Sequence, residues 1–244
     1  MKCYFFGMNR VLKTSLVASI GLCFAAPAAM ADAAAERVLE KARIASTVQM
    51  QDLDGYINKN GKKTPLKLYL RRENIQFQFW TGKEWSKFHM ELKDGGGRLF
   101  ELRGGKTFKF DKKKLTESIM DTDLTYEDLA MTFLYWKNAK IERQELVKTS
   151  KCDVLRLERA NGAGAYDIVY AWVNQKFGAL MKVVGYDSQG RRLKEFGVEK
   201  LMKVKNGWTL KRMKVSRYDP NTKKLLGKTY LDFKEPKKVN QPLQ

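Results

Sequence analysis

The 244-residue chain has few of the residues that catalytic and metal sites usually require. It contains one histidine, three cysteines and five prolines. A single histidine, His89, and the absence of a G-x-S-x-G motif leave a histidine-based triad without support. One histidine and so few cysteines do not supply the usual zinc ligands. We therefore predict a protein that is not an enzyme and that has no metal and no cofactor.

Acidic residues are also scarce, with 27 Asp and Glu against 47 Lys and Arg and a net charge of +20. The hydrophobic share of 43% is ordinary for a globular domain and argues against intrinsic disorder. Such an excess of basic charge is typical of proteins that meet nucleic acid, an anionic membrane or an acidic partner. The expected location of the chain helps to choose among these partners.

Residues 1–31 have the pattern of a secretory signal peptide. Three basic residues and no acids accompany an apolar run over 16–26, and Ala29-Met30-Ala31 forms a small-x-small cleavage signature. The run is shorter than the ~18 residues of a membrane span. We predict cleavage after about Ala31, a charge of +17 for the remaining chain, a periplasmic location and no nucleic-acid partner.

Loss of that leader would leave Cys152 as the last cysteine, so we expect no internal disulfide. Cys152 stands beside Lys151 at the start of a predicted strand, and we interpret it as a half-buried structural residue and not as a reactive thiolate. His89 lies between Phe88 and Met90 on the polar side of a strand, and we expect it to be exposed there.

Residues 33–46 repeat apolar side chains at helical spacing, which predicts an amphipathic helix with Asp32 as its N-cap. From about Met50 the apolar period becomes two, and turn sequences such as Asn60-Gly61 and Gly104-Gly105 separate the runs. This pattern predicts a β-meander over 50–112. Its apolar face comprises Leu66, Leu68, Leu70, Ile75, Phe77, Phe79, Phe88, Met90 and Leu92.

A helical interruption is expected within residues 121–136. Thr125 and Asp128 have the spacing of a capping box, and Leu124, Leu129, Phe133 and Trp136 give the segment an apolar face. Three aspartates at 121, 123 and 128 lack the glycine and the distal glutamate of an EF-hand, so helix capping explains them better than calcium does. We predict one helix that ends near Trp136 and covers the inner face of the sheet.

Strands are expected to resume at 140–148, 152–160, 166–173, 178–186, 192–204, 207–218 and 225–234. With the meander they give about ten or eleven antiparallel strands in one domain, residues 32–244. The fold class is mainly β, with helices against the concave apolar face. Periodicity alone leaves two interpretations of that face open, a filled core or a pocket for a lipid.

Several features together resemble the LolA-like family of periplasmic outer-membrane lipoprotein-sorting proteins. They are the leader, the alanine-rich helix, Tyr69-Leu70-Arg71, the segment DTDLTYEDL at 121–129, and the dipeptides Tyr186-Asp187 and Tyr218-Asp219. The resemblance implies a half-open β-barrel of antiparallel strands, capped by helices, around a hydrophobic cavity. From the periodicity above, we expect the nine residues of the apolar face to line that cavity and Leu124, Leu129, Phe133 and Trp136 to form a lid or plug over it.

The resemblance also implies a function. A protein of this kind would carry the acyl chains of lipoproteins, or another lipid, toward the outer membrane, and its partners would include an inner-membrane transporter. The alternative is a periplasmic sensor or an exporter accessory on the same scaffold. Basic residues on the outward strand faces, such as Lys67, Lys211 and Lys214, would favour transient contact with an anionic membrane surface. Solubility alone is the other explanation of these charges.

Overall fold

A computed structural model describes residues 26–47, 50–93, 96–204 and 207–235. The predicted signal peptide therefore lies mostly outside the described residues. The first described element, the helix α1 (Ala26–Thr47), contains the predicted helix at 33–46 but starts earlier. Asp32 lies inside this helix, so the prediction that it is the N-cap was wrong. No helix of the described ranges is long and apolar enough to cross a membrane.

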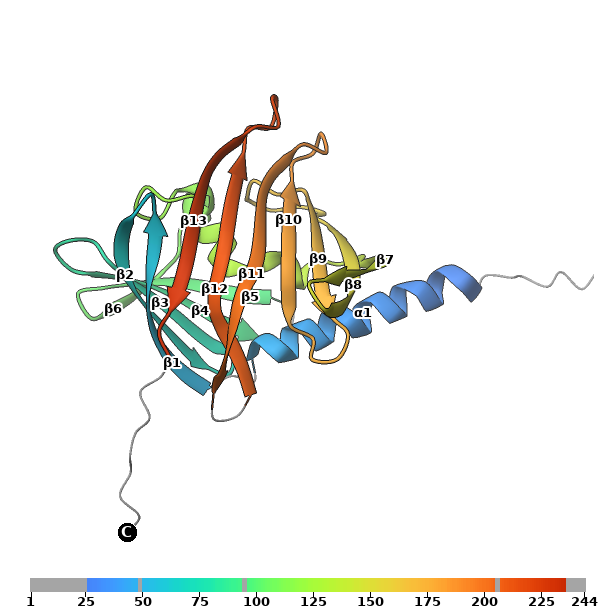
Figure 1. Ribbon diagram of the computed structural model, residues 1–244, viewed down its shortest axis with the longest axis horizontal. Helices are drawn as coiled ribbons and strands as arrows, with labels where there is room; N and C mark the ends of the chain where they lie inside the picture. Colours follow the sequence, from blue (N-terminus) through green and yellow to red (C-terminus); the bar gives the residue numbers. More distant parts are fainter. Residues whose placement is uncertain (1–25, 48–49, 94–95, 205–206, 236–244) are drawn as a thin grey trace, which may run out of the picture.

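One antiparallel sheet of thirteen strands makes up most of the fold (Figure 1). Its order is β6-β5-β4-β3-β2-β1-β13-β12-β11-β10-β9-β8-β7, and among the described residues the outer strands β6 and β7 do not pair with each other. The strands are β1 (Met50–Lys59), β2 (Lys62–Arg71), β3 (Asn74–Trp80), β4 (Trp85–Lys93), β5 (Gly96–Arg103), β6 (Lys106–Lys109), β7 (Lys140–Val147), β8 (Ser150–Glu158), β9 (Ile168–Asn174), β10 (Leu180–Tyr186), β11 (Arg192–Val204), β12 (Gly207–Tyr218) and β13 (Leu225–Phe233).

The mainly β class is confirmed, but the predicted ten or eleven strands are too few. The strands β1 and β5 were not named individually, because Gly55 interrupts the apolar pattern of β1 and the adjacent Leu99 and Phe100 break the alternation of β5. In β1, Gly55 takes an inward position between Leu53 and Ile57. A Cβ at Gly55 would lie 2.2 Å from the carbonyl oxygen of Asp232, so glycine allows β13 to approach β1 closely.

The residues between β6 and β7 do not form the single helix predicted up to Trp136. They form a 3-10 helix η1 (Lys112–Thr116), a short α2 (Tyr126–Ala130) and a second 3-10 helix η2 (Thr132–Tyr135). The break falls at Met131, whose backbone is left-handed with φ 44° and ψ 37°. That conformation cannot continue an α-helix. We call residues 118–136 the plug.

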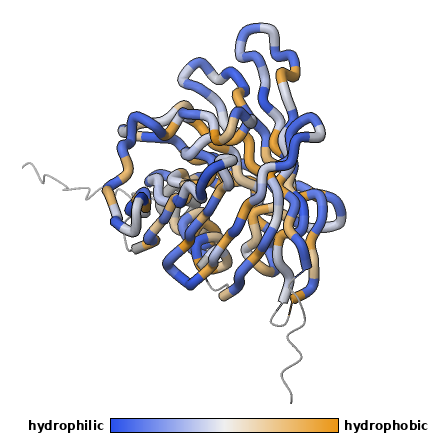
Figure 2. The backbone as a smooth tube through the Cα atoms, turned by 90° about the vertical axis from the view of Figure 1, so that its left-hand side faces the viewer, coloured by the Kyte–Doolittle hydropathy of each residue, from blue (hydrophilic) through white to orange (hydrophobic). Residues whose placement is uncertain are grey.

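The core lies between the inner face of the sheet, the plug and α1. Along the strands, apolar and polar residues alternate, as Figure 2 shows in orange and blue. The helix contributes Ala35, Leu39 and Ala42, all fully buried. Figure 1 shows the sheet bending around the helical segments. The predicted turn at Asn60-Gly61 is confirmed, since both residues have positive φ, at 52° and 84°.

Candidate functional site

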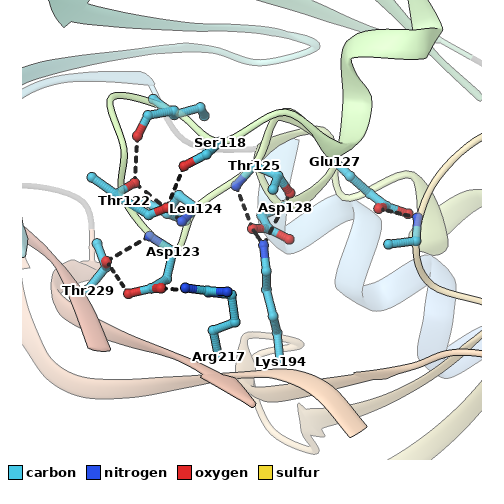
Figure 3. Close-up of polar contacts among 12 residues, drawn as sticks. Ser118, Thr122, Asp123, Leu124, Thr125, Glu127, Asp128, Lys194, Arg217 and Thr229 are labelled. Carbon is cyan, nitrogen blue, oxygen red and sulfur yellow. Dashed lines mark hydrogen bonds and ion pairs between the residues drawn. The ribbon is translucent and has the colours of Figure 1, made fainter. Parts of the chain in front are cut away.

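The plug is attached to the sheet by a buried ion pair. The Nζ atom of Lys194, on β11, lies 2.6 Å from Oδ2 of Asp128, and the Asp128 side chain is fully buried (Figure 3). The same oxygen accepts a hydrogen bond from the backbone N–H of Thr125 at 2.7 Å. The other oxygen accepts the hydroxyl of Tyr166 at 2.5 Å. Thus Asp128 caps α2, as predicted, and also joins it to β11 and to the loop before β9.

A second buried carboxylate holds the loop before α2. Oδ1 of Asp123 lies 2.8 Å from Nε of Arg217 and 3.2 Å from Nζ of Lys59. Its Oδ2 accepts the hydroxyl of Thr229 at 3.0 Å, and its own N–H donates to that hydroxyl oxygen (Figure 3). Burial raises the pKa of Asp123, but the hydrogen bonds from Arg217, Thr229 and Lys59 outweigh it and the pKa is lowered. Helix capping therefore does not explain Asp123, which pairs instead with cations of β1 and β12.

A third acid connects the plug to the loop before β9. Glu127 accepts the backbone N–H of Ala165 at 2.7 Å and that of Tyr166 at 3.4 Å. Burial raises its pKa, and the two N–H donors offset only part of this effect. Burial likewise raises the pKa of Tyr166 well above 10, with the nearby Asp128 adding to the shift. These three acids, Asp123, Glu127 and Asp128, are the latch of the plug.

The helix α1 holds the other end of the plug. Nε of Arg43 donates to the carbonyl oxygen of Leu134 at 2.7 Å, and its guanidinium lies 5.4 Å from the ring centre of Tyr135. Polar contacts therefore fix the plug at the latch and near its C-terminal end, and the residues between them include the buried Leu129, Ala130 and Phe133.

Two pockets flank the Asp128–Lys194 pair. The first is a small apolar pocket of about 60 Å³ between the plug and β10–β12. Its lining includes Met131, Phe133, Val183, Phe196, Val198 and Met213. The second pocket measures about 470 Å³ and is lined mainly by residues with polar or charged groups; we call it the polar pocket. Its lining includes Lys59, Asp123, Glu127, Lys194, Arg217 and Tyr218. An apolar space and a polar space therefore meet at the latch.

All nine predicted cavity residues are buried in the core under the plug, each with at most 9% of its surface exposed. None of them lines either pocket. Of the predicted lid residues, Leu124, Leu129 and Phe133 are buried, and Trp136 is half-buried. Only Phe133 of these four reaches the apolar pocket. That the nine residues bind a lipid stays a prediction.

Sequence reasoning missed the basic partners of the latch. Lys194, Arg217 and Lys59 belong to strands far from the plug in sequence, and nothing local marks them. The acids themselves gave a signal, because three carboxylates within 123–128 accompany apolar residues that were predicted to be covered. Buried carboxylates need cationic or N–H partners. The sequence could therefore have indicated that these acids have such partners, but not which residues they are.

Two residues considered for chemistry have structural surroundings. Cys152 is fully buried, and burial raises the pKa of its thiol, which opposes thiolate formation. His89 is half-buried and not exposed as predicted, with its ring centre 6.0 Å from that of Phe100. Burial lowers its pKa. In the described ranges, no group of three His, Cys, Asp or Glu residues is arranged to hold a metal ion.

Solved structures show which fold this is. A DUF1329 family protein from Desulfovibrio piger matches with a TM-score of 0.63 and 18% identity, over 82% of this chain and 91% of that one. A candidate outer membrane lipoprotein-sorting protein domain from Vibrio parahaemolyticus gives 0.62 and 15%, over 82% and 92%. A LolA superfamily protein from Nitrosomonas europaea gives 0.59 and 17%, over 82% and 91%. The chain shares the fold of these three structures.

The family itself follows from a sequence model. A family model described as "uncharacterized protein" matches residues 103–242, more than half of the chain, and the chain belongs to that family. The matched region includes the plug and the strands β7–β13, hence all three acids of the latch and the two cations Lys194 and Arg217. No curated protein matches the chain.

Proposed function

We propose that the protein is a non-catalytic periplasmic carrier that holds an acyl chain of a lipoprotein, or another lipid, beneath the plug and moves it toward the outer membrane. The observation that carries this proposal is an apolar pocket whose cover is held by charged contacts. The fold supports it, since a relative with the same fold is described as a lipoprotein-sorting domain. An inner-membrane transporter would deliver the cargo to this protein.

The plug must move for such a cargo to enter. Ligand pockets usually measure ~300–1,000 Å³, and the apolar pocket has only about 60 Å³. Tyr126 of the plug packs on Phe88 of β4, with ring centres 5.4 Å apart. Movement of the plug would therefore uncover Phe88 and its neighbours on the inner face, the residues that the sequence analysis assigned to the cavity.

The chemistry of the latch suits a reversible cover. A buried ion pair adds little net stability relative to apolar packing, but removing one of its partners leaves an uncompensated buried charge. Breaking the Asp128–Lys194 pair would join the apolar pocket to the polar one. A long apolar chain would then lie on the inner face, and its polar end would reach the cations of the larger pocket. Each buried methylene contributes ~0.8 kcal/mol, so one long chain suffices for tight binding.

The proposal is tested by native mass spectrometry of the purified protein and by titration with a fluorescent fatty acid. We expect a copurified lipid and saturable probe binding. Val198→Phe fills the apolar pocket and should weaken probe binding at least tenfold. The control Leu226→Phe changes an aliphatic side chain that is 50% exposed on β13 and should leave binding unchanged.

A folded wild-type protein that carries no lipid and binds no probe would contradict the proposal. Equal affinities for wild type and Val198→Phe, with both proteins folded by circular dichroism, would move the binding site away from this pocket.

A further inference from the structure

Exposed apolar side chains gather at one end of the sheet. Trp208 and Leu201 are 62% and 41% exposed on neighbouring strands of the β11–β12 hairpin. Phe177, in the turn between β9 and β10, is 62% exposed. The strand β11 continues beyond its pairing with β10 as far as Val204. The β9–β10 turn and the β11–β12 hairpin therefore lie at the same end of the sheet. Isolated exposed apolar residues are common, but a group of large ones is not.

Lysines surround these three side chains. Lys203 pairs across the hairpin with Trp208, Lys200 precedes Leu201, and Lys176 lies over the ring of Phe177 at 5.1 Å. Residues 200–218 contain seven basic residues and no acidic one. In the described part of the chain, no ion pair involves Lys176, Lys200 or Lys203. We call Lys176, Phe177, Lys200, Leu201, Lys203 and Trp208 the basic rim.

Contacts with other elements hold the basic rim in place. Lys148, in the turn between β7 and β8, donates to the carbonyl oxygen of Glu199 on β11. Lys41 of α1 donates to the carbonyl oxygen of Gln175, next to Lys176. The backbone of Lys41 also passes close to Gly178, where a Cβ would lie 2.6 Å from its carbonyl oxygen. Both parts of the rim are therefore connected to neighbouring elements, one to the β7–β8 turn and the other to α1.

From this arrangement we infer that the basic rim docks the protein on an anionic lipid bilayer. Tryptophan prefers the boundary between headgroups and acyl chains, and lysines with free charges are attracted to anionic headgroups. A protein partner would more often meet a rim that contains arginine and paired charges, whereas this one offers only unpaired lysines. The inference concerns a surface remote from the latch and goes beyond the proposed carriage of a lipid.

The geometry also relates the rim to the latch. Arg217 and Lys194 lie toward the end of β12 and the beginning of β11 that face away from the β11–β12 turn. The basic rim would therefore hold the molecule at the bilayer while the polar pocket remains at the far end of the sheet. The rim and the pockets can be tested separately.

Flotation with vesicles of phosphatidylglycerol and phosphatidylcholine tests the inference. We expect wild type to bind these vesicles, to ignore pure phosphatidylcholine, and to be released by salt. Lys200→Gln with Lys203→Gln should weaken binding about fivefold for each lysine. The control Lys223→Gln with Lys224→Gln removes two exposed lysines at the opposite turn, between β12 and β13, and should have little effect.

The depth to which Trp208 inserts into the bilayer provides an independent test of docking. Brominated acyl chains should quench part of the tryptophan fluorescence of wild type, and Trp208→Phe should abolish this quenching. Equal vesicle binding by the rim and control variants would overturn the inference, as would quenching unchanged in Trp208→Phe. Rim variants should still bind the fatty-acid probe in solution, so failure of docking is distinguishable from failure of the carrier function. Rim variants that lose a protein partner but keep vesicle binding would also overturn it.

Discussion

Lys194 and Asp128 form an ion pair of 2.6 Å that links β11 to the plug, and both side chains are at least nine-tenths buried. Their separation by 66 residues means that the pair forms only when the sheet and the plug are assembled. It is the natural point at which to test how the plug is held.

Removing one charge of this pair should destabilise the protein. In Asp128→Asn the lysine stays buried without its carboxylate, and we expect the free energy of unfolding to fall by about 3–5 kcal/mol. Lys194→Met combined with Asp128→Asn removes both charges and should recover much of the loss. Urea denaturation measures the effect.

The exposed pair Arg71–Asp52 provides the control. Its side chains are about half exposed. We expect Asp52→Asn to cost only about 0–1 kcal/mol. If the variants Asp128→Asn and Asp52→Asn lost equal stability, the buried pair would not hold the plug.

Glu127 should make stability rise as the pH falls. Its pKa in the folded protein is raised above the ordinary 4.5 by burial, so the folded state binds the proton more tightly than the unfolded state. The stabilisation from protonated Glu127 is fully present below pH 4.5 and is lost as the pH rises through the folded-state pKa. Urea denaturation of wild type and Glu127→Gln at a series of pH values should show the difference, and a difference independent of pH would contradict it.

Asp123 should act in the opposite direction. Its folded-state pKa lies below the ordinary 3.8, because Arg217, Thr229 and Lys59 stabilise the charged form against the opposing effect of burial. The stabilisation from ionised Asp123 is fully present above pH 3.8 and is lost as the pH falls through the lower folded-state pKa. The stability gap between wild type and Asp123→Asn should therefore narrow in acid. A gap that widened would refute the assigned ion pairs.

Gly164 should tolerate alanine poorly. Its φ is +138°, and a Cβ there would lie 2.1 Å from Oε1 of Glu127. Gly162 has a φ of +111° with open space around it. Gly162→Ala measures backbone strain alone, on the order of 1–3 kcal/mol. We expect Gly164→Ala to lower the stability more than Gly162→Ala does in thermal denaturation, because it also displaces the side chain of Glu127. An equal loss of stability in the two variants would show that the Glu127 side chain can move without cost.

Alternation in the sequence was enough to predict the class and most strands. The seven strands after the plug lie within a few residues of their predicted positions, from β7 at Lys140–Val147 to β13 at Leu225–Phe233. Most of their side chains alternate because one face of the sheet is covered, but β9 and β10 contain runs of residues that are buried on both faces. Glycine hid β1, since Gly55 has no side chain to mark its inward position.

The plug was harder to predict. Its apolar spacing fitted one helix, but the left-handed backbone at Met131 divides it, and a methionine gives no local sign of such a turn. The latch was invisible for another reason. The partners of Asp123 lie 64, 94 and 106 residues away, and sequence spacing carries no information on contacts that only the curved sheet creates.

Among the described residues, the outer strands β6 and β7 each pair with one neighbour only, and this bears on how the protein behaves at high concentration. Unpaired strand edges offer N–H and C=O groups to any other chain, and short or charged edges discourage such pairing. The edge strand β6 has only four residues, Lys106-Thr107-Phe108-Lys109, all exposed. The edge strand β7 begins with exposed Lys140, Glu142 and Arg143. In the described part of the chain, the short length of β6 and the charges of β7 therefore oppose strand-by-strand aggregation, even though Phe108 and Leu146 expose apolar surface at these edges.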